Sequence, residues 1–103
     1  MAPETAAQGF AAMGSEARLA VLRALVRAGA DGLAVGEIQD RTGIAPSTLA
    51  HHLRFLSAAG LVEQEKLGRT VVSRAAYGTL EELAEFILGE CCADQKKKAA
   101  NDG

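Results

Sequence analysis

The stretch GIAPSTLAHHLRFLSAAGLV, residues 43–62, contains the pattern from which the rest of the chain can be placed. Its leucines recur at the spacing that puts side chains on one face of a helix: Leu49, Leu53 and Leu56. The opposite face carries Ser47, His51 and Arg54, which can all form hydrogen bonds. Such a helix can enter a DNA major groove, or it can be an ordinary amphipathic surface helix. The neighbouring segments distinguish these two interpretations.

A shorter helix is predicted directly upstream, over residues 34–42, with Val35 and Ile38 facing inward. Gly43 ends this helix. Pro46 suits the first turn of the next helix, because its missing N–H would have no partner there. Two short helices joined by a tight, glycine-containing turn are typical of a helix-turn-helix.

Downstream of Gly60 the pattern changes to strands. Residues 61–67 and 69–77 are two short runs with β-branched residues, separated by Gly68, so we predict a hairpin with its tip at residues 66–70. A hairpin directly behind a helix of this kind is the order of a winged helix, and it favours DNA recognition as the use of residues 43–62.

Further helices are predicted on both sides of this unit. Residues 2–13 predict a weak first helix, and Ser15 is the expected N-cap of a second helix that runs to Ala28. We expect that helix to bury four apolar residues: Leu19, Leu22, Leu25 and Val26. A last helix, capped by Thr79, has an apolar stripe: Leu80, Leu83, Ala84, Ile87, Leu88 and Cys91.

The predicted fold class is mainly α with a small β-hairpin, a winged helix-turn-helix with flanking N- and C-terminal helices. We place one domain at residues 1–93. Residues 94–103 contain too few apolar side chains to pack and are predicted to be a disordered tail.

The composition limits the classes of function. A net charge of −2 and a pI of about 5.6 argue against a purely electrostatic nucleic-acid binder, but not against a small basic face. No apolar run is long enough for a membrane span, and the first ten residues lack the segments of a secretory signal, so we expect a cytoplasmic protein with no membrane partner. No nucleophile and base lie at motif spacing, so no enzyme is expected.

Four segments carry a family resemblance: SEARL at residues 15–19, VGEI at 35–38, AHHLRFL at 50–56 and AGLV at 59–62. With them the chain resembles the ArsR/SmtB family of small winged-helix repressors. The resemblance implies a homodimer formed by the first and last helices, and double-stranded operator DNA as the partner. It also implies that the fourth helix lies in the major groove, with the hairpin over the backbone.

Two departures from the family pattern matter. Many metal-sensing members carry a Cys-x-Cys type motif in the third helix, where this chain has EIQD at residues 37–40, so that metal site is absent. Ala50 stands where the family often has a serine, which removes one hydrogen bond to DNA.

The candidate DNA contacts lie on the fourth helix and the hairpin. Ser47, Thr48 and His51 suit base edges or phosphates, and Arg54 lies one turn further along. His52 lies nearer the leucines, so it is either a packed histidine or a contact. On the hairpin, Lys66, Arg69 and Arg74 are candidates for phosphate, with Arg69 the best placed. We predict DNA contacts at seven residues: Ser47, Thr48, His51, His52, Arg54, Lys66 and Arg69.

Cys91 and Cys92 are the only cysteines and are adjacent. Their Cα atoms lie about 3.8 Å apart, shorter than the roughly 4.4–6.8 Å of a disulfide, so no structural bridge is expected. Adjacent thiols can hold one soft ion. Zinc needs four donors, and the only histidines lie elsewhere. Trivalent arsenic or antimony takes up to three thiolates, and a methylated arsenical needs only two.

The resemblance adds that vicinal cysteines late in the last helix occur in arsenic-responsive members of the family. We therefore predict a repressor that needs no cofactor and is released from its operator by arsenite, methylarsenite or antimonite at Cys91 and Cys92. Two alternatives stay open. One is a redox or persulfide sensor, although the negative helix end beside Glu90 and Asp94 disfavours the thiolate that such chemistry needs. The other is a constitutive DNA-binding regulator whose cysteines only pack.

Overall fold

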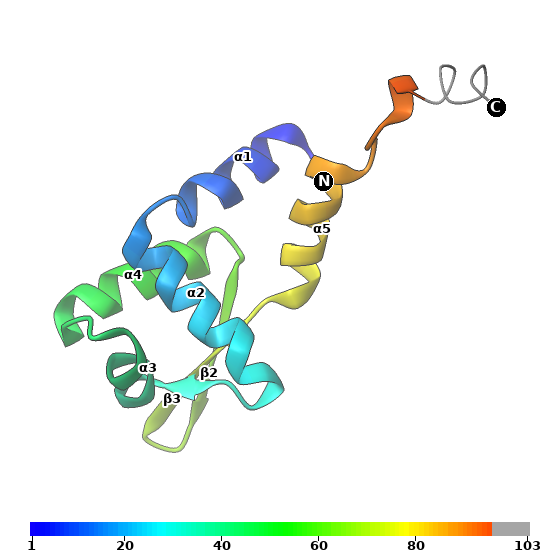
Figure 1. Ribbon diagram of the computed structural model, residues 1–103. Coiled ribbons are helices and arrows are strands. Elements are labelled where there is room, and N and C mark those ends of the chain that lie inside the picture. Colours follow the sequence, from blue (N-terminus) through cyan, green and yellow to red (C-terminus); the bar gives the residue numbers. More distant parts are fainter. Residues whose placement is uncertain (96–103) are drawn as a thin grey trace.

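The computed structural model describes residues 1–95, which form a mainly helical domain with a small antiparallel sheet (Figure 1). The elements follow in this order: α1 (Pro3–Ala12), α2 (Glu16–Ala28), η1 (Gly29–Asp31), β1 (Leu33–Ala34), α3 (Val35–Thr42), α4 (Pro46–Ala58), β2 (Val62–Leu67), β3 (Thr70–Ala75), α5 (Tyr77–Leu88) and η2 (Ala93–Gln95). The predicted winged helix-turn-helix with flanking helices is confirmed. Of the predicted tail, Asp94 and Gln95 belong to η2, and residues 96–103 lie outside the described residues.

The sheet has the order β1-β3-β2, and both pairings are antiparallel. The hairpin β2–β3, hereafter the wing, runs in register from Val62 opposite Ala75 to Leu67 opposite Thr70. β1 pairs Leu33 with Ser73 and was not predicted. A strand of two residues has no sequence period, so only its tertiary pairing with β3 defines it.

The core lies where α2, α3 and α4 meet the base of the wing. The leucine face of α4 is buried as predicted: Leu49 and Leu56 are completely buried and Leu53 nearly so. Ile38 of α3 and Leu61, just before β2, are also completely buried. The three leucines therefore fix which face of α4 points outward.

The predicted apolar face of α2 is wrong in part. Leu22 and Leu25 are buried, but Leu19 and Val26 are each 43% exposed, and Val21 is completely buried. Because α2 packs against α3, α4 and β3, its buried face is rotated from the one that we expected. Leu19 and Val26, seven residues apart, form an exposed apolar line. Val35, predicted to point inward, is also exposed, at 37%.

α5 begins at Tyr77, two residues before the predicted cap, and Thr79 does not cap it. The Tyr77 hydroxyl bonds to the carbonyl oxygens of Leu25 and Val26, at 3.3 and 3.1 Å, at the C-terminal end of α2. This contact joins the start of α5 to α2. The last carbonyls of a helix have no partner within it, so a side-chain donor there satisfies them.

We expect Tyr77→Phe to lower the free energy of unfolding by about 1 kcal/mol, because a helix end loses its donor while the ring still packs. Urea denaturation followed by circular dichroism measures this change. Thr79→Val, a change of similar size in the same first turn of α5, is the control. An unchanged midpoint for Tyr77→Phe would show that water replaces the contact at no cost.

The rest of α5 contacts little within one chain. Leu83 is its only buried residue, and it packs on Gly9 of α1, where an added Cβ would lie 3.0 Å from a Leu83 methyl. The predicted apolar stripe of α5 is therefore mostly exposed: Ile87 is 63% exposed and Leu88 61%. α1 and α5 lie on the side of the molecule away from α3 and the tip of the wing (Figure 1). No helix in residues 1–95 is long and apolar enough to cross a membrane.

Candidate nucleic-acid interface

The turn that positions α4 is held by local hydrogen bonds. Gly43 ends α3 in the left-handed conformation, with φ 72° and ψ 8°, and its N–H donates to Gln39 at 2.8 Å. The Thr42 hydroxyl donates to the carbonyl of Ile38 at 2.8 Å and accepts from the N–H of Ile44 at 3.3 Å. These contacts set the direction in which the chain enters α4.

With its leucines in the core, α4 presents Ser47, Thr48, His51 and Arg54 to solvent. Ala45, the residue before the helix, provides no side-chain cap, so the first N–H groups of α4 have no side-chain acceptor there. Residues 46–58 contain no acidic side chain. Four of the five predicted contacts of α4 therefore share one surface that can donate hydrogen bonds to an anionic partner.

His52 lies on the core side of α4 and is only partly exposed. Its Nδ1 atom is buried and has no hydrogen-bond partner within the described part of the chain. Of the two interpretations of His52, this position favours the packed histidine over the DNA contact.

His51 is not an isolated surface group. Its ring lies 4.9 Å from the ring of Phe55, in an edge-to-face arrangement at 77°. The Arg18 guanidinium lies 5.0 Å from the centroid of Phe55, and Arg18 Nε donates to the carbonyl of Ala12. Neither Phe55 nor Arg18 was predicted from the sequence as part of this surface. An aromatic residue four positions after His51 and off the leucine face was the available signal for Phe55, but no local pattern indicates Arg18.

The basic residues of the wing differ in their exposure and in their contacts. Lys66 and Arg69 are exposed near its tip. Arg74 instead donates to the carbonyl of Ala30 at 2.7 Å and lies 3.6 Å from the carboxylate of Glu65. Because these acceptors hold Arg74 on the domain, it is a weaker phosphate candidate than Arg69. This agrees with the order that the sequence suggested.

An open groove of about 560 Å³ lies between α4 and the wing. Arg54 and Ala50 line it from α4, and Gln64 and Val71 from the wing. The fold thus brings the exposed face of α4 beside the wing, as a surface that contacts DNA through both elements requires.

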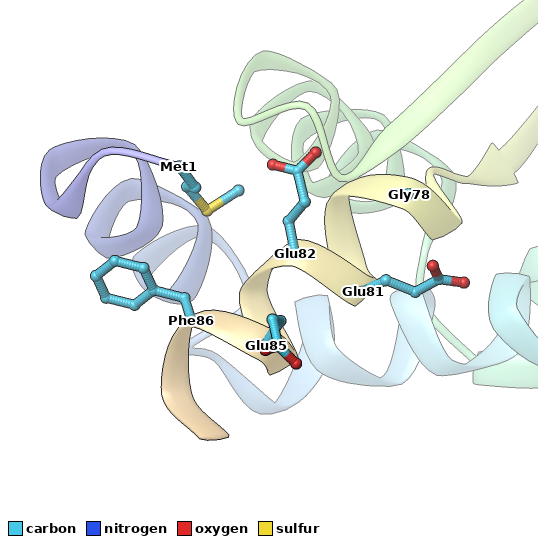
Figure 2. Close-up of a pocket in the computed structure, with 6 residues that line it drawn as sticks. All are labelled: Met1, Gly78, Glu81, Glu82, Glu85 and Phe86. Atoms are coloured by element: carbon cyan, nitrogen blue, oxygen red, sulfur yellow. The ribbon is translucent and has the colours of Figure 1, made fainter. Parts of the chain in front are cut away.

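Three acidic residues lie together on α5, away from α4. Beside α5 is a depression of about 670 Å³ that Figure 2 shows in close-up, lined by Met1, Gly78, Glu81, Glu82, Glu85 and Phe86. These three carboxylates are three of the 13 acidic residues of the chain, and they belong to a different helix from the acid-free α4. The overall acidity therefore does not describe the α4 surface.

The two thiols lie where we did not predict them. α5 ends at Leu88, so Cys91 is not in its apolar stripe, and both cysteines are exposed. After α5 the chain, coloured orange, extends away from the body of the domain (Figure 1). Cys92 has a φ of 62°, which L-residues rarely adopt. The two Sγ atoms lie 3.4 Å apart.

Residues 1–95 form no closed metal site around the two thiols. Among residues 1–95, no group of three or more His, Cys, Asp and Glu side chains could hold a metal ion. The thiol pair therefore offers two ligands at an open position, which is too few for structural zinc.

The comparisons with known proteins agree with this fold. A family model described as a helix-turn-helix domain matches residues 13–65. The HTH-type transcriptional regulator YceK of Bacillus subtilis is 38% identical over 64 residues, which cover 62% of this chain and 63% of YceK. The chain thus spans less than two thirds of the length of this curated relative.

Two solved structures extend the likeness to nearly the whole chain. An ArsR-like transcriptional regulator from Rhodococcus sp. RHA1 is 29% identical with a TM-score of 0.72, over 95% of this chain and 89% of that one. A homodimeric winged helix-turn-helix DNA-binding domain from Mycobacterium bovis is 27% identical with a TM-score of 0.68, over 93% and 84%. From the family model, the winged-helix architecture and these structures together, the chain belongs to the ArsR family of winged-helix transcriptional regulators.

Proposed function

We propose that this protein is a homodimeric transcriptional repressor that binds a pseudo-palindromic operator through α4. The observation that carries this proposal is the exposed, acid-free face of α4 beside the wing. Ser47, Thr48, His51 and Arg54 would contact base edges and phosphates, and Lys66 and Arg69 the flanking backbone. In this proposal His52 packs within the domain and does not contact DNA.

The dimer would cover the apolar surface that one chain leaves exposed. Exposed apolar side chains on α2 and α5 are available for it: Leu19, Val26, Phe86, Ile87 and Leu88. A helix with most of its apolar side chains in solvent favours association, because burial in a partner removes them from water. The Mycobacterium bovis relative is described as homodimeric, which supports the same state for this chain.

Selection of duplexes from a randomised library tests the DNA-binding proposal. We expect the recovered sites to be inverted repeats whose half-sites lie about 34 Å, one helical turn, apart. The affinity for the selected duplex should exceed that for a scrambled duplex of equal length by at least about a thousandfold. Equal affinities would contradict sequence-specific binding.

Arg69→Gln is expected to weaken binding to selected and scrambled duplexes by similar factors, because a phosphate contact carries no sequence information. The slope of log K against log salt should fall by about one. Fluorescence anisotropy at several salt concentrations measures this slope. Arg74→Gln, which removes the same charge from an arginine already held by Ala30 and Glu65, should change it less. An unchanged slope for Arg69→Gln would remove that residue from the contacts.

For the effector we propose a trivalent arsenical or antimonial bound by Cys91 and Cys92. The support is that both thiols are exposed and their Sγ atoms lie 3.4 Å apart. With bonds of about 2.3 Å, the length of a zinc–thiolate bond, this separation corresponds to an angle of about 95° at the bound atom, below the roughly 109° of a tetrahedral site. A smaller angle suits a pyramidal centre with a lone pair.

The binding step is an exchange of ligands. Methylarsenite carries one methyl group and two hydroxyls on arsenic. Each thiol forms an S–As bond, a hydroxyl leaves with the thiol proton as water, and the oxidation state of arsenic does not change. Arsenite would keep one hydroxyl, or take a thiol of the partner subunit in its place. No resident cofactor takes part in this proposal.

A further inference from the structure

A series of contacts joins the end of α1 to the exposed face of α4. Arg18 Nε donates to the carbonyl oxygen of Ala12, the last residue of α1. The Arg18 guanidinium lies 5.0 Å from the centroid of the Phe55 ring, and that ring lies 4.9 Å from the ring of His51. We propose that Arg18 and Phe55 are positioning residues that hold the His51 imidazole in the orientation in which α4 presents it to DNA. This inference rests on the proposed DNA-binding function.

The exposure of Phe55 is the first argument. Phe55 is 47% exposed although its helix buries three leucines on another face. A half-exposed aromatic ring gains less from burial than a ring in the core, and here it also contacts a cation and an imidazole, and both contacts are favourable. His51 and Phe55 lie at i and i+4, the spacing at which helix side chains meet. Phe55 therefore restricts the rotamers of His51 rather than completing the core.

The second argument is that a hydrogen bond to the backbone of α1 fixes the position of the Arg18 side chain. A guanidinium that donates to a main-chain carbonyl loses rotamer freedom, and Arg18 is only partly exposed. The ring of Phe55 thus rests against a cation whose place is set by the end of α1. Arg18 thus links the end of α1 to the pair formed by Phe55 and His51 on α4.

Restricting His51 before binding should strengthen the complex. An exposed side chain that becomes ordered at an interface lowers affinity by roughly two- to tenfold, and a side chain already held in place avoids that loss. The same contacts extend toward the proposed dimer elements, since α1 packs through Gly9 on Leu83 of α5. A displacement of α1 would therefore shift Arg18 and, through Phe55, the His51 ring.

A double-mutant cycle on affinity for the library-selected duplex tests the proposal. Arg18→Met removes the charge and the donor but keeps an unbranched side chain. Arg23→Met removes the same charge from an exposed position of the same helix and is the matched control. We expect Arg18→Met to bind the duplex about two- to tenfold more weakly than Arg23→Met. In a His51→Ala background this excess should disappear, because Arg18 acts through His51.

An equal excess in both backgrounds, or no excess over Arg23→Met, would overturn the proposal. A second readout needs no DNA. In the ¹H–¹³C spectrum of the free protein, Arg18→Met and Phe55→Leu should each shift the His51 ring resonances while the methyl resonances of buried Leu49 stay in place. Unmoved His51 resonances would also overturn it. A wild type without preference for any duplex would instead overturn the DNA-binding function, and the His51 spectrum would still decide the positioning role.

Discussion

Replacing Ile87 and Leu88 together by glutamine is expected to convert the proposed dimer into monomers. Both side chains are more than 60% exposed in one chain, and in the proposed dimer the partner subunit would bury them. Full burial of such a side chain contributes about 1.5–3 kcal/mol, and a dimer contains four of them, which gives an upper figure of roughly 6–12 kcal/mol. A micromolar dimer is held by only about 8 kcal/mol. Sedimentation velocity at micromolar concentration measures the change.

Loss of the dimer should also weaken binding to the operator. A monomer contacts one half-site, so we expect operator affinity to fall at least a hundredfold while binding to a single half-site is retained. Leu67→Gln with Val71→Gln, the same kind of change at exposed apolar residues of the wing, is the control for oligomeric state and should leave it unchanged. A glutamine variant of α5 that stays dimeric would exclude these two residues from the interface.

Substitution of either thiol is expected to abolish the response to arsenicals. In the wild type, methylarsenite should lower operator affinity by about 5–150-fold, the range of a 1–3 kcal/mol coupling between two sites. Cys91→Ser and Cys92→Ser each leave one thiol, which cannot bridge the arsenic, so both variants should stay bound to the operator. Anisotropy with the selected duplex, titrated with methylarsenite, arsenite, antimonite, zinc and polysulfide in turn, measures the response.

The outcomes of this titration separate the candidate functions. Release by arsenicals that persists in both serine variants would contradict the thiol site. Release by polysulfide alone would identify a persulfide sensor, for which the exposed thiols are equally accessible. Failure of every thiophilic compound would indicate a constitutive regulator. The double serine variant without ligand should bind the operator like the wild type, because both cysteines lie in the turn beyond α5, away from the core.

The part of the fold that depends on local chemistry was predictable from sequence. The leucine spacing of residues 49–56 predicted the buried face of α4, and the order helix, turn, helix, hairpin predicted the winged helix. Ser15 was expected as the N-cap of α2, and its hydroxyl accepts from the N–H of Arg18 at 3.1 Å. Each of these predictions needs only residues within one or two turns of one another.

The wrong predictions concern features that depend on contacts between segments far apart in the sequence. Whether Leu19 and Val26 are buried depends on which face of α2 meets α3 and α4. The periodicity of the sequence does not determine that face, because α2 carries apolar residues on more than one side. The apolar stripe of α5 was extended to Cys91, yet a helix continues only where packing or capping supports it, and α5 ends at Leu88. The thiols consequently lie in an exposed turn.

By itself, the sequence of this protein determined the winged-helix order, the outward face of α4 and the presence of two adjacent thiols, because these depend on spacing along the chain. Only the tertiary structure decided that His51 lies against Phe55 and Arg18, that Arg74 is held by Ala30 and Glu65, and that most of α5 is exposed. Arg18 and His51 are 33 residues apart, and Ala30 and Arg74 are 44 apart. Contacts over such separations follow from how the helices pack, which no local period encodes.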